Sequence, residues 1–234
     1  MKVIAVIPAR YNSQRFPGKP IFPIKGKPMI QWVWEGIKKA NSVEDIIIAT
    51  DDKRIEDVVK SFGGKVFLTS SEHKSGSDRI GEVLKYIHAD IVVNVQCDEP
   101  MIDGMIIDKL VEEMIKDENA DIVTPYVLSS SPGDENIVKI VIDQNSYALY
   151  FSRSPIPYYF DDKREYLIHK GIYVYRNDFL KKFISSPQSY LEKSERLEQL
   201  RALYIGGKIK VVKIEKNLIS VDRIEDIKKV EVFL

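Results

Sequence analysis

Cysteine is almost missing from this chain: its 234 residues include one, Cys97, so no disulfide can form within the chain. Disulfide-stabilised secreted scaffolds are therefore excluded, and the composition is compatible with the cytoplasm. A long hydrophobic run is missing as well. The apolar start of the sequence is interrupted by Pro8 and Arg10, and no segment approaches the roughly 20 apolar residues that span a membrane. We expect a cytoplasmic protein with no signal peptide and no membrane partner.

An excess of either charge is also missing, because 35 Lys and Arg residues balance 35 Asp and Glu residues. Proteins that bind nucleic acid usually carry a basic excess, so nucleic acid is not an expected partner. Hydrophobic residues make up 44% and charged residues 30% of the chain, which is typical of a folded protein. The length suits one large α/β domain or two small ones, and local basic clusters can still bind a small anion.

Short apolar runs alternate with amphipathic patterns through the first half of the sequence. The continuous run at 46–48 is typical of a strand buried on both faces, whereas apolar residues at 30, 33, 34 and 37 have helical spacing. The predicted strands are 3–7, 45–50, 65–69, 90–95 and 120–127, and the predicted helices are 29–40, 53–62, 77–87 and 106–116. This order predicts a three-layer α/β fold with a mostly parallel sheet. Ligands of such sheets bind beyond the carboxyl ends of the strands.

The pattern changes in the second half of the sequence. Two strand-like runs at 138–142 and 148–152 are separated by turn residues, which predicts a β-hairpin. A strand at 167–176, a helix at 191–203, a strand at 210–214 and a closing helix at 224–232 follow. We interpret residues 1–234 as a single domain, with a β-hairpin and strand extension in the C-terminal half.

The loop after the first predicted strand carries three cations, Arg10, Arg15 and Lys19, together with Gly18. A triphosphate needs several fixed cations, and a transferring phosphoryl group needs them at its non-bridging oxygens. The glycine spacings of a P-loop and of a dinucleotide-binding fingerprint are both missing. The loop therefore indicates a phosphate site of another kind, and a solvated basic loop is the alternative.

Two adjacent acids, Asp98 and Glu99, follow the fourth predicted strand. Mg²⁺ is held by one or two carboxylates together with phosphate oxygens, and Asp98 is the better ligand because it lies nearer the strand end. Asp222 is a candidate second carboxylate far along the chain. The alternatives are that the two acids cap the next segment and that Asp222 is the N-cap of the last helix.

Other polar stretches are less specific by themselves. Residues 73–79 open a predicted helix, whose backbone N–H groups are suited to an anion or a base. His169 alone is more typical of a structural histidine than of a catalyst. Cys97 stands beside acids, which raise the pKa of a thiol, so a nucleophilic role is not expected.

Eleven stretches of the sequence carry a family resemblance that covers essentially the whole chain. They are residues 7–11 (IPARY), 15–20 (RFPGKP), 26–30 (GKPMI), 49–51 (ATD), 73–79 (HKSGSDR), 94–96 (NVQ), 98–100 (DEP), 147–153 (YALYFSR), 169–173 (HKGIY), 197–201 (LEQLR) and 221–222 (VD). Together they resemble the 3-deoxy-manno-octulosonate cytidylyltransferases, also called CMP-Kdo synthetases. The first loop is shared with other sugar nucleotidyltransferases, whereas 150–153, 169–173 and 197–201 together are more specific to the Kdo branch.

The resemblance implies a nucleotide-diphospho-sugar transferase (Rossmann-like) fold and a homodimer, with residues of about 138–215 forming a sugar-binding and dimerisation extension. It implies a Mg²⁺-dependent enzyme that transfers CMP from CTP to Kdo, releases pyrophosphate and so activates Kdo for lipopolysaccharide synthesis. The implied catalytic residues are Arg10, Arg15, Lys19 and Asp98, and the implied metal ligands are Asp98 and Asp222. The implied nucleotide-binding residues are Pro8, Ala9, Arg10, Lys19, Thr50, Asp51, Ser75, Gly76, Ser77 and Arg79. The implied sugar-binding residues are Arg79, Gln96, Arg153, His169, Tyr173, Glu198 and Gln199.

Two positions depart from the family's pattern. Cys97 stands where the family usually has glycine, and Arg223-Ile224 follows Asp222 where the family commonly has Thr-Pro. Cysteine would be strained if position 97 had a positive φ, and we interpret the position as one that needs only a small side chain. The alternatives to a Kdo enzyme are a cytidylyltransferase for a related sugar acid, such as sialic acid or amino-Kdo, and a nucleotide-binding module without catalysis.

Overall fold

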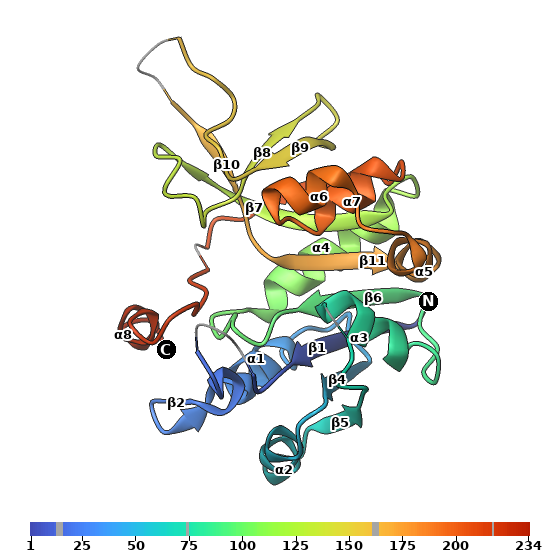
Figure 1. Ribbon diagram of the computed structural model, residues 1–234, viewed down its shortest axis with the longest axis vertical. Coiled ribbons are helices and arrows are strands. Elements are labelled where there is room, and N and C mark those ends of the chain that lie inside the picture. Colours follow the sequence, from blue (N-terminus) through green and yellow to red (C-terminus); the bar gives the residue numbers. More distant parts are fainter. Residues whose placement is uncertain (13–15, 74, 161–163, 217) are drawn as a thin grey trace. The chain divides into compact units, whose positions relative to one another are not determined.

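The computed structural model describes residues 1–12, 16–73, 75–160, 164–216 and 218–234 (Figure 1). The chain forms two compact units: unit 1 contains Met1–Lys109 and Leu218–Leu234, and unit 2 contains Leu110–Asn217. Unit 2 is thus an insertion in the sequence of unit 1. The interpretation of the chain as one domain with a C-terminal extension stays a prediction.

Unit 1 is built on a parallel sheet with the strand order β5-β4-β1-β6 (Figure 1). The strands are β1 (Val3–Ala9), β4 (Asp45–Thr50), β5 (Lys65–Leu68) and β6 (Ile91–Val95). All seven residues of β1 and all five of β6 are buried. This burial explains why both strands are continuous apolar runs rather than alternating ones.

Three helices connect these strands: α1 (Met29–Ile37), α2 (Lys53–Ser61) and α3 (Gly76–Val83). The chain moves outward from β1 through β4 to β5 and then crosses back to β6. Because such crossovers are right-handed, α1 and α2 cover one face of the sheet and α3 covers the other. Asp52 caps α2 by accepting a hydrogen bond from the Arg54 backbone N–H at 2.9 Å.

Parts of unit 1 differ from the sequence-based expectation. The segment predicted as one long loop contains a 3-10 helix, η1 (Lys19–Ile21), and a two-stranded ribbon of β2 (Pro23–Ile24) and β3 (Lys27–Pro28). Gly18 precedes η1 with φ 73°, a conformation that favours glycine. The closing helix is α8 (Asp226–Glu231), which begins two residues later than predicted.

Unit 2 is organised around β7 (Ile122–Ser129). On one side β12 (Ile209–Lys213) pairs with it in parallel, and β10 (Tyr166–His169) and β11 (Ile172–Arg176) are antiparallel to it. The predicted hairpin is present as β8 (Lys139–Ile142) and β9 (Ala148–Ser152), and β8 also pairs with β10. Helix α4 (Gly104–Lys116) precedes these strands in the sequence, and the boundary between the two units falls within it.

The predicted strand and helix in the later part of unit 2 are each divided in two. Residues 167–176 form β10 and β11, which are separated at Lys170 and Gly171. The predicted helix at 191–203 is α6 (Tyr190–Glu195) followed by α7 (Gln199–Tyr204), and Arg196 between them has φ 53°. A further helix, α5 (Asn177–Ser185), was not predicted.

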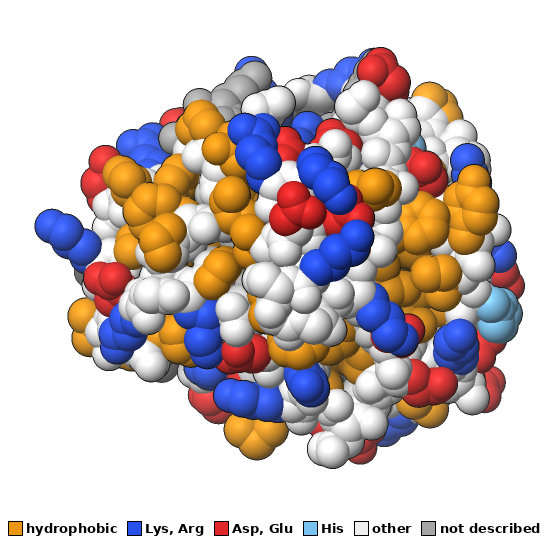
Figure 2. Space-filling view, turned by 90° about the horizontal axis from the view of Figure 1, so that it is seen from below, with side chains coloured by type: hydrophobic (Ala, Val, Ile, Leu, Met, Phe, Trp, Pro, Cys, Tyr) orange, Lys and Arg blue, Asp and Glu red, His pale blue; other side chains and the backbone are white. Residues whose placement is uncertain are grey.

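The surface carries both charge signs in close alternation. On the face shown in Figure 2, Lys and Arg side chains lie among Asp and Glu side chains, and hydrophobic side chains appear between them. This mixture agrees with the balanced composition of 35 basic and 35 acidic residues. In the part of the chain that the structure describes, every helix is too short or too polar to cross a membrane.

Candidate functional site

The parallel register of unit 1 brings the candidate loops together at one edge of the sheet. Ala9 at the end of β1 pairs with Thr50 at the end of β4, and Val6 pairs with Asn94 near the end of β6. The loops that follow these three strands therefore begin side by side. This is the edge at which open parallel sheets bind ligands.

Gly76, the first residue of α3, shows how closely these loops approach one another. A Cβ atom at this position would lie 3.1 Å from Pro8 Cγ and 3.7 Å from Gln96 Nε2. The Gln96 amide in turn donates a hydrogen bond to Asn94 Oδ1 at 3.0 Å. Three residues that the sequence predicted for the site thus lie together: one at the end of β1, one at the start of α3 and one just after β6.

Lys19 is a buried cation in this group, with 8% of the residue exposed. Its Nζ donates to Asp98 Oδ2 at 2.5 Å and to the Val221 carbonyl oxygen at 3.1 Å. Burial acts to lower the pKa of Lys19, but Asp98, Cys97 and Asp222 favour the charged form, and the pKa is raised overall. Lys19 is therefore an ammonium fixed on the carboxylate that the sequence predicted as a metal ligand.

A short segment near the end of unit 1 brings the second predicted metal ligand to the first. The Val221 backbone N–H donates to the Asp98 carbonyl oxygen at 2.9 Å, and the Ser220 hydroxyl donates to the Glu99 carboxylate. Asp222 is the next residue along, and its charge acts on the same ammonium as Asp98. Carboxylate oxygens are the protein ligands that Mg²⁺ prefers, so Asp98 and Asp222 fit this ion.

The coordination of such an ion would need oxygen atoms from the substrate as well. Within the described ranges, no group of three His, Cys, Asp or Glu side chains is placed to hold a metal by itself. Two carboxylates completed by phosphate oxygens are the usual arrangement for Mg²⁺ in nucleotide enzymes. The alternative role for Asp222 is wrong, because α8 begins at Asp226 with Glu225 at its N-cap position. The Asp226 carboxylate instead accepts the Asp222 backbone N–H at 3.2 Å.

Cys97 lies beside this cluster with its thiol buried. Burial, followed by the charge of Asp98, raises the pKa of Cys97 to about 12, while Lys19 and Arg10 act in the opposite direction. The thiol is therefore protonated at neutral pH, as the sequence predicted. Cys97 is not among the described residues with positive φ, so its backbone does not require the glycine of the family pattern.

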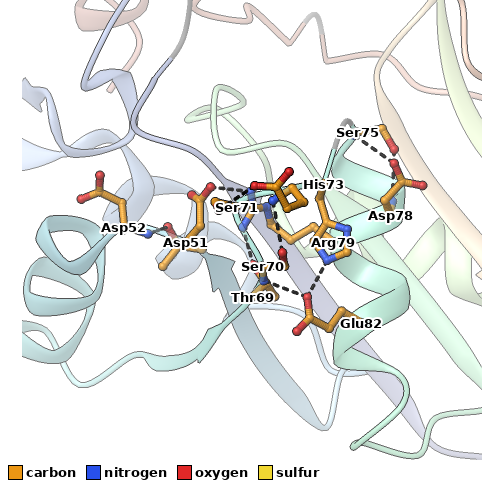
Figure 3. Close-up of polar contacts among 12 residues, drawn as sticks. Asp51, Asp52, Thr69, Ser70, Ser71, His73, Ser75, Asp78, Arg79 and Glu82 are labelled. Atoms are coloured by element: carbon orange, nitrogen blue, oxygen red, sulfur yellow. Dashed lines mark hydrogen bonds and ion pairs between the residues drawn. The ribbon is translucent and has the colours of Figure 1, made fainter.

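Arg79 is the second buried cation of unit 1, with 1% of the residue exposed (Figure 3). Its guanidinium forms an ion pair with Asp51 at 3.1 Å and donates to the Thr69 hydroxyl. Thr69 in turn donates its backbone N–H to the Thr50 carbonyl oxygen at 2.8 Å. Arg79 on α3 thus ties together the loops that follow β4 and β5.

The start of α3 is fixed by a capping box that includes another predicted site residue (Figure 3). The Ser75 hydroxyl accepts the Asp78 backbone N–H, and the Asp78 carboxylate accepts the Ser75 backbone N–H, both at 3.1 Å. Farther along the helix, Glu82 accepts the Ser70 backbone N–H at 2.9 Å and contacts His73 Nε2 at 2.5 Å. Ser77, between the cap and Arg79, is buried.

The basic loop itself is held at its two ends. The Gly18 backbone N–H donates to the Tyr11 carbonyl oxygen at 2.8 Å, and the Arg54 guanidinium lies 3.3 Å from the centre of the Tyr11 ring. The sequence did not predict a role for Arg54, because a charged residue at the start of a helix gives no sign that it contacts this loop. Arg10 is exposed, and Arg15 lies outside the described residues.

Unit 2 holds most of the predicted sugar residues, and His169 is one of them. The Thr124 hydroxyl lies 2.7 Å from the Ile172 carbonyl oxygen and 2.9 Å from His169 Nε2. A hydroxyl has one proton, and a carbonyl can only accept, so Thr124 donates to Ile172 and accepts from His169. This assigns the proton of neutral His169 to Nε2 and leaves Nδ1 as an acceptor. Thr124 was missed because a threonine within an apolar strand carries no functional signal.

Burial shifts the pKa of both aromatic residues in this group, His169 and Tyr173. It lowers the pKa of His169 to about 3, with Lys170 acting in the same direction, so the imidazole is neutral in the physiological range. The ring of Tyr173 lies 5.3 Å from that of His169, and burial, followed by the charge of Glu198, raises the pKa of Tyr173. Both side chains are therefore neutral hydrogen-bonding groups, suited to sugar hydroxyls.

Arg153 is fixed by main-chain oxygens rather than by a carboxylate. Its Nε donates to the Glu195 carbonyl at 2.7 Å, Nη1 to Glu135 at 2.8 Å and Nη2 to Arg196 at 3.4 Å. Three of its five N–H groups are used in this way, and its positive charge is not neutralised by these carbonyls. The nearby Lys139 ammonium, which is buried, donates to the Arg153 carbonyl.

Glu198 is held at the start of α7 by Arg201. Arg201 Nη2 donates to Glu198 Oε1 at 2.8 Å, and the same guanidinium pairs with buried Glu192 at 3.0 Å. Gln199 is buried beside them. Arg201 lies in the family-like stretch 197–201 but was not predicted as a site residue. The structure shows that it is the partner that fixes Glu198.

The predicted site residues that the structure describes divide between the two units. Pro8, Ala9, Lys19, Thr50, Asp51, Ser75, Gly76, Ser77, Arg79, Gln96, Asp98 and Asp222 belong to unit 1. Arg153, His169, Tyr173, Glu198 and Gln199 belong to unit 2.

The chain is similar to known proteins over its full length. The family described as Cytidylyltransferase matches residues 4–214. The 3-deoxy-manno-octulosonate cytidylyltransferase of Bdellovibrio bacteriovorus is 42% identical, with 100% of this chain and 98% of that protein covered. The protein of the same name from Geotalea daltonii is 44% identical, with coverage of 98% and 97%.

A solved structure is similar as well. CMP:2-keto-3-deoxy-manno-octonic acid synthetase, complexed with CTP, has a TM-score of 0.95 and 41% sequence identity. The match covers 100% of this chain and 98% of that one. It confirms the predicted nucleotide-diphospho-sugar transferase fold.

Proposed function

This chain belongs to the 3-deoxy-manno-octulosonate cytidylyltransferase family, and on that premise we propose that it transfers CMP from CTP to Kdo and releases pyrophosphate. The product is activated Kdo, as lipopolysaccharide synthesis requires. The observation that carries the proposal is the cluster of Lys19, Asp98 and Asp222 at the strand ends of unit 1. An ammonium group and two carboxylates in one place suit the binding of a triphosphate together with Mg²⁺.

The reaction would be an in-line attack by the anomeric hydroxyl of Kdo on the α-phosphate of CTP, with no nucleophile from the enzyme. Arg10, Arg15 and Lys19 would hold the triphosphate and stabilise charge on the α-phosphate. Thr50, Asp51 and residues 75–79 would lie around the cytidine and ribose. Their role is supported by the fixed geometry of Arg79, which cannot move without breaking its contacts to Asp51 and Thr69.

Asp98 and Asp222 would hold Mg²⁺ together with phosphate oxygens of CTP. When bound, this ion neutralises phosphate charge and orients the α-phosphate for attack. The family resemblance supports a role in sugar binding for Gln96 and Arg79 of unit 1, and likewise for the predicted sugar residues of unit 2. Arg153 would pair with the carboxylate of Kdo, because the guanidinium keeps its charge and two N–H groups beyond its carbonyl contacts.

His169, Tyr173, Glu198 and Gln199 would bind the hydroxyl groups of the sugar. The neutral rings of His169 and Tyr173 and the fixed Glu198 carboxylate support this assignment, because each offers an oriented donor or acceptor. We further propose a cytoplasmic homodimer, with residues 138–215 contributing to sugar binding and dimerisation. The family resemblance supports this arrangement, and gel filtration of the purified chain tests the dimer.

The direct test measures pyrophosphate release from CTP with Mg²⁺, with and without Kdo, and with a sialic acid as the control. We expect release that requires both Kdo and Mg²⁺. Asp98→Asn should reduce this turnover at least about a thousandfold, because the amide loses the charge that holds the metal. Asp57→Asn, which changes an exposed carboxylate of α2 that pairs with Lys53 at 3.4 Å, serves as the matched control. Turnover of Asp98→Asn close to wild type would contradict the metal assignment.

Sugar specificity is decided by the same assay. Release only with another sugar acid would keep the mechanism and move the substrate to that sugar. CTP binding without release, whichever sugar is supplied, would favour a nucleotide-binding module without catalysis.

A further inference from the structure

The Lys19 ammonium already occupies a carboxylate oxygen that the proposed metal site needs, Asp98 Oδ2. Its Nζ lies 2.5 Å from Asp98 Oδ2, and the lysine side chain is 10% exposed. The Val221 carbonyl accepts a second hydrogen bond from it at 3.1 Å. Two of the three ammonium N–H groups are therefore taken by described residues of this cluster.

The cluster is fixed by its backbone as well as by its charges. The Val221 N–H donates to the Asp98 carbonyl oxygen at 2.9 Å, so the segment before Asp222 cannot move away from Asp98 independently. Asp222 also acts on Lys19 by its charge. One buried ammonium thus balances two carboxylates that would otherwise repel each other.

A divalent cation and this ammonium cannot share the same oxygen atoms. Both are positive, and at contact distance in a partly buried site their repulsion is strong. Lys19 has a long unbranched side chain, so rotation about its bonds can move Nζ from Asp98 to a nearby phosphate oxygen. A triphosphate bound beside the basic loop would supply such an oxygen.

We propose that Lys19 blocks divalent-cation binding to Asp98 and Asp222 until phosphate oxygens of the nucleotide accept its ammonium. The cation then binds only together with the nucleotide, and the carboxylates are never left without a counter-charge. This inference rests on the proposed function, and it adds an order of binding that the reaction itself does not require.

The test uses Mn²⁺ alone as the probe and measures its dissociation constant by calorimetry on the full chain without nucleotide. Lys19→Met removes the ammonium and should tighten Mn²⁺ binding at least about tenfold. Lys19→Arg keeps a positive charge and should bind Mn²⁺ as weakly as wild type. Lys27→Met is the matched control: its ammonium pairs with Glu35 at 2.6 Å instead, and the change should leave Mn²⁺ binding within about twofold.

Equal Mn²⁺ affinities for wild type and Lys19→Met would overturn the proposal. If Lys19→Met does not fold, as circular dichroism would show, Lys19→Gln replaces it. The wild type by itself also tests the proposal. A dissociation constant for Mn²⁺ below about 0.1 mM, measured without nucleotide, would contradict a blocked site. Pyrophosphate release by the wild type is measured in parallel. Release without the Mn²⁺ effect refutes this inference alone, and the Mn²⁺ effect without release refutes the proposed function alone.

Discussion

At the level of single residues, Cys97 shows how a thiol is kept inert beside charged groups. Its backbone has no positive φ, so a side chain is tolerated where the family pattern has glycine. Its thiol is buried next to Asp98, and both effects raise its pKa to about 12. The sequence predicted the direction of this shift from the neighbouring acids, whereas the contribution of burial required the fold.

Cys97→Gly should therefore leave turnover within a few-fold of wild type while lowering the free energy of unfolding by about 1–2 kcal/mol. The loss has two causes: a glycine gains backbone freedom in the unfolded chain, and the buried side chain is removed. Urea denaturation measures the change. In the native wild type, iodoacetamide at pH 8 should modify Cys97 much more slowly than a free thiol. Rapid native alkylation, or an inactive glycine variant, would contradict this account.

Other single residues mark the limit of sequence-based prediction. Asp98 was predicted as a ligand because it comes soon after a buried strand, and the structure ends that strand, β6, at Val95. The contact of Lys19 with Val221 joins residues 202 positions apart, and no local pattern encodes such a distance. Thr124 and Arg201 act through hydrogen bonds to other side chains, so their roles appear only when the partners are placed.

At the level of elements, the break between α6 and α7 is the clearest departure from expectation. Leucines at helical spacing predicted one helix over 191–203, but Arg196 adopts φ 53° and ends α6. Glu198 then stands at the N-cap position of α7, within reach of Arg201. Hydrophobic spacing reports which residues of a segment are apolar and gives no sign that one of them, Leu197, lies between two helices rather than within one.

Arg201 should be essential to this pair of helices. It is 5% exposed and pairs with Glu192, which is also 5% exposed, so its removal would leave a buried carboxylate without a counter-charge. We expect Arg201→Met to lower the free energy of unfolding by about 3–5 kcal/mol. Urea denaturation measures this loss, and any residual folded protein should show a raised KM for Kdo because Glu198 is released.

Lys181→Met provides the matched control for Arg201→Met. Lys181 pairs with Asp178 at 3.6 Å, but both side chains are largely exposed, so the change should cost less than about 1 kcal/mol. Similar losses in the two variants would show that the Arg201 pairs contribute no more than a surface contact.

At the level of the whole molecule, the stability of the protein should depend on pH through His169. The pKa of His169 is about 3 in the folded chain against an ordinary value of 6.5. Between these values the unfolded chain binds the extra proton, so the free energy of unfolding falls as the pH falls through this range. From pH 6.5 to pH 5 the loss is up to about 2 kcal/mol.

His169→Asn cannot take up this proton and should show a correspondingly flatter dependence of stability on pH. Urea denaturation of both proteins at pH 7 and pH 5 measures the difference. His88→Asn, which changes an exposed histidine, is the control and should behave as wild type. Parallel pH dependences for His169→Asn and wild type would show that His169 is not buried as a neutral ring.

The architecture of unit 1 followed from the sequence more fully than that of unit 2. Parallel strands buried on both faces leave continuous apolar runs, and the alternation with helices then fixes the class of fold. In unit 2, the strands are partly exposed and mostly antiparallel, and β7 pairs with β10 and β11 in antiparallel and with β12 in parallel orientation. Such pairing depends on register and on the break at Lys170 and Gly171, which single-sequence patterns do not specify.

The insertion of unit 2 within unit 1 has a consequence for how the protein is made. A ribosome produces the chain from its N-terminus, so Lys19 and Asp98 emerge long before Val221 and Asp222. All of unit 2 is synthesised in between. The nascent chain therefore contains the basic loop and Asp98 well before Asp222, the second carboxylate proposed for Mg²⁺, has been translated.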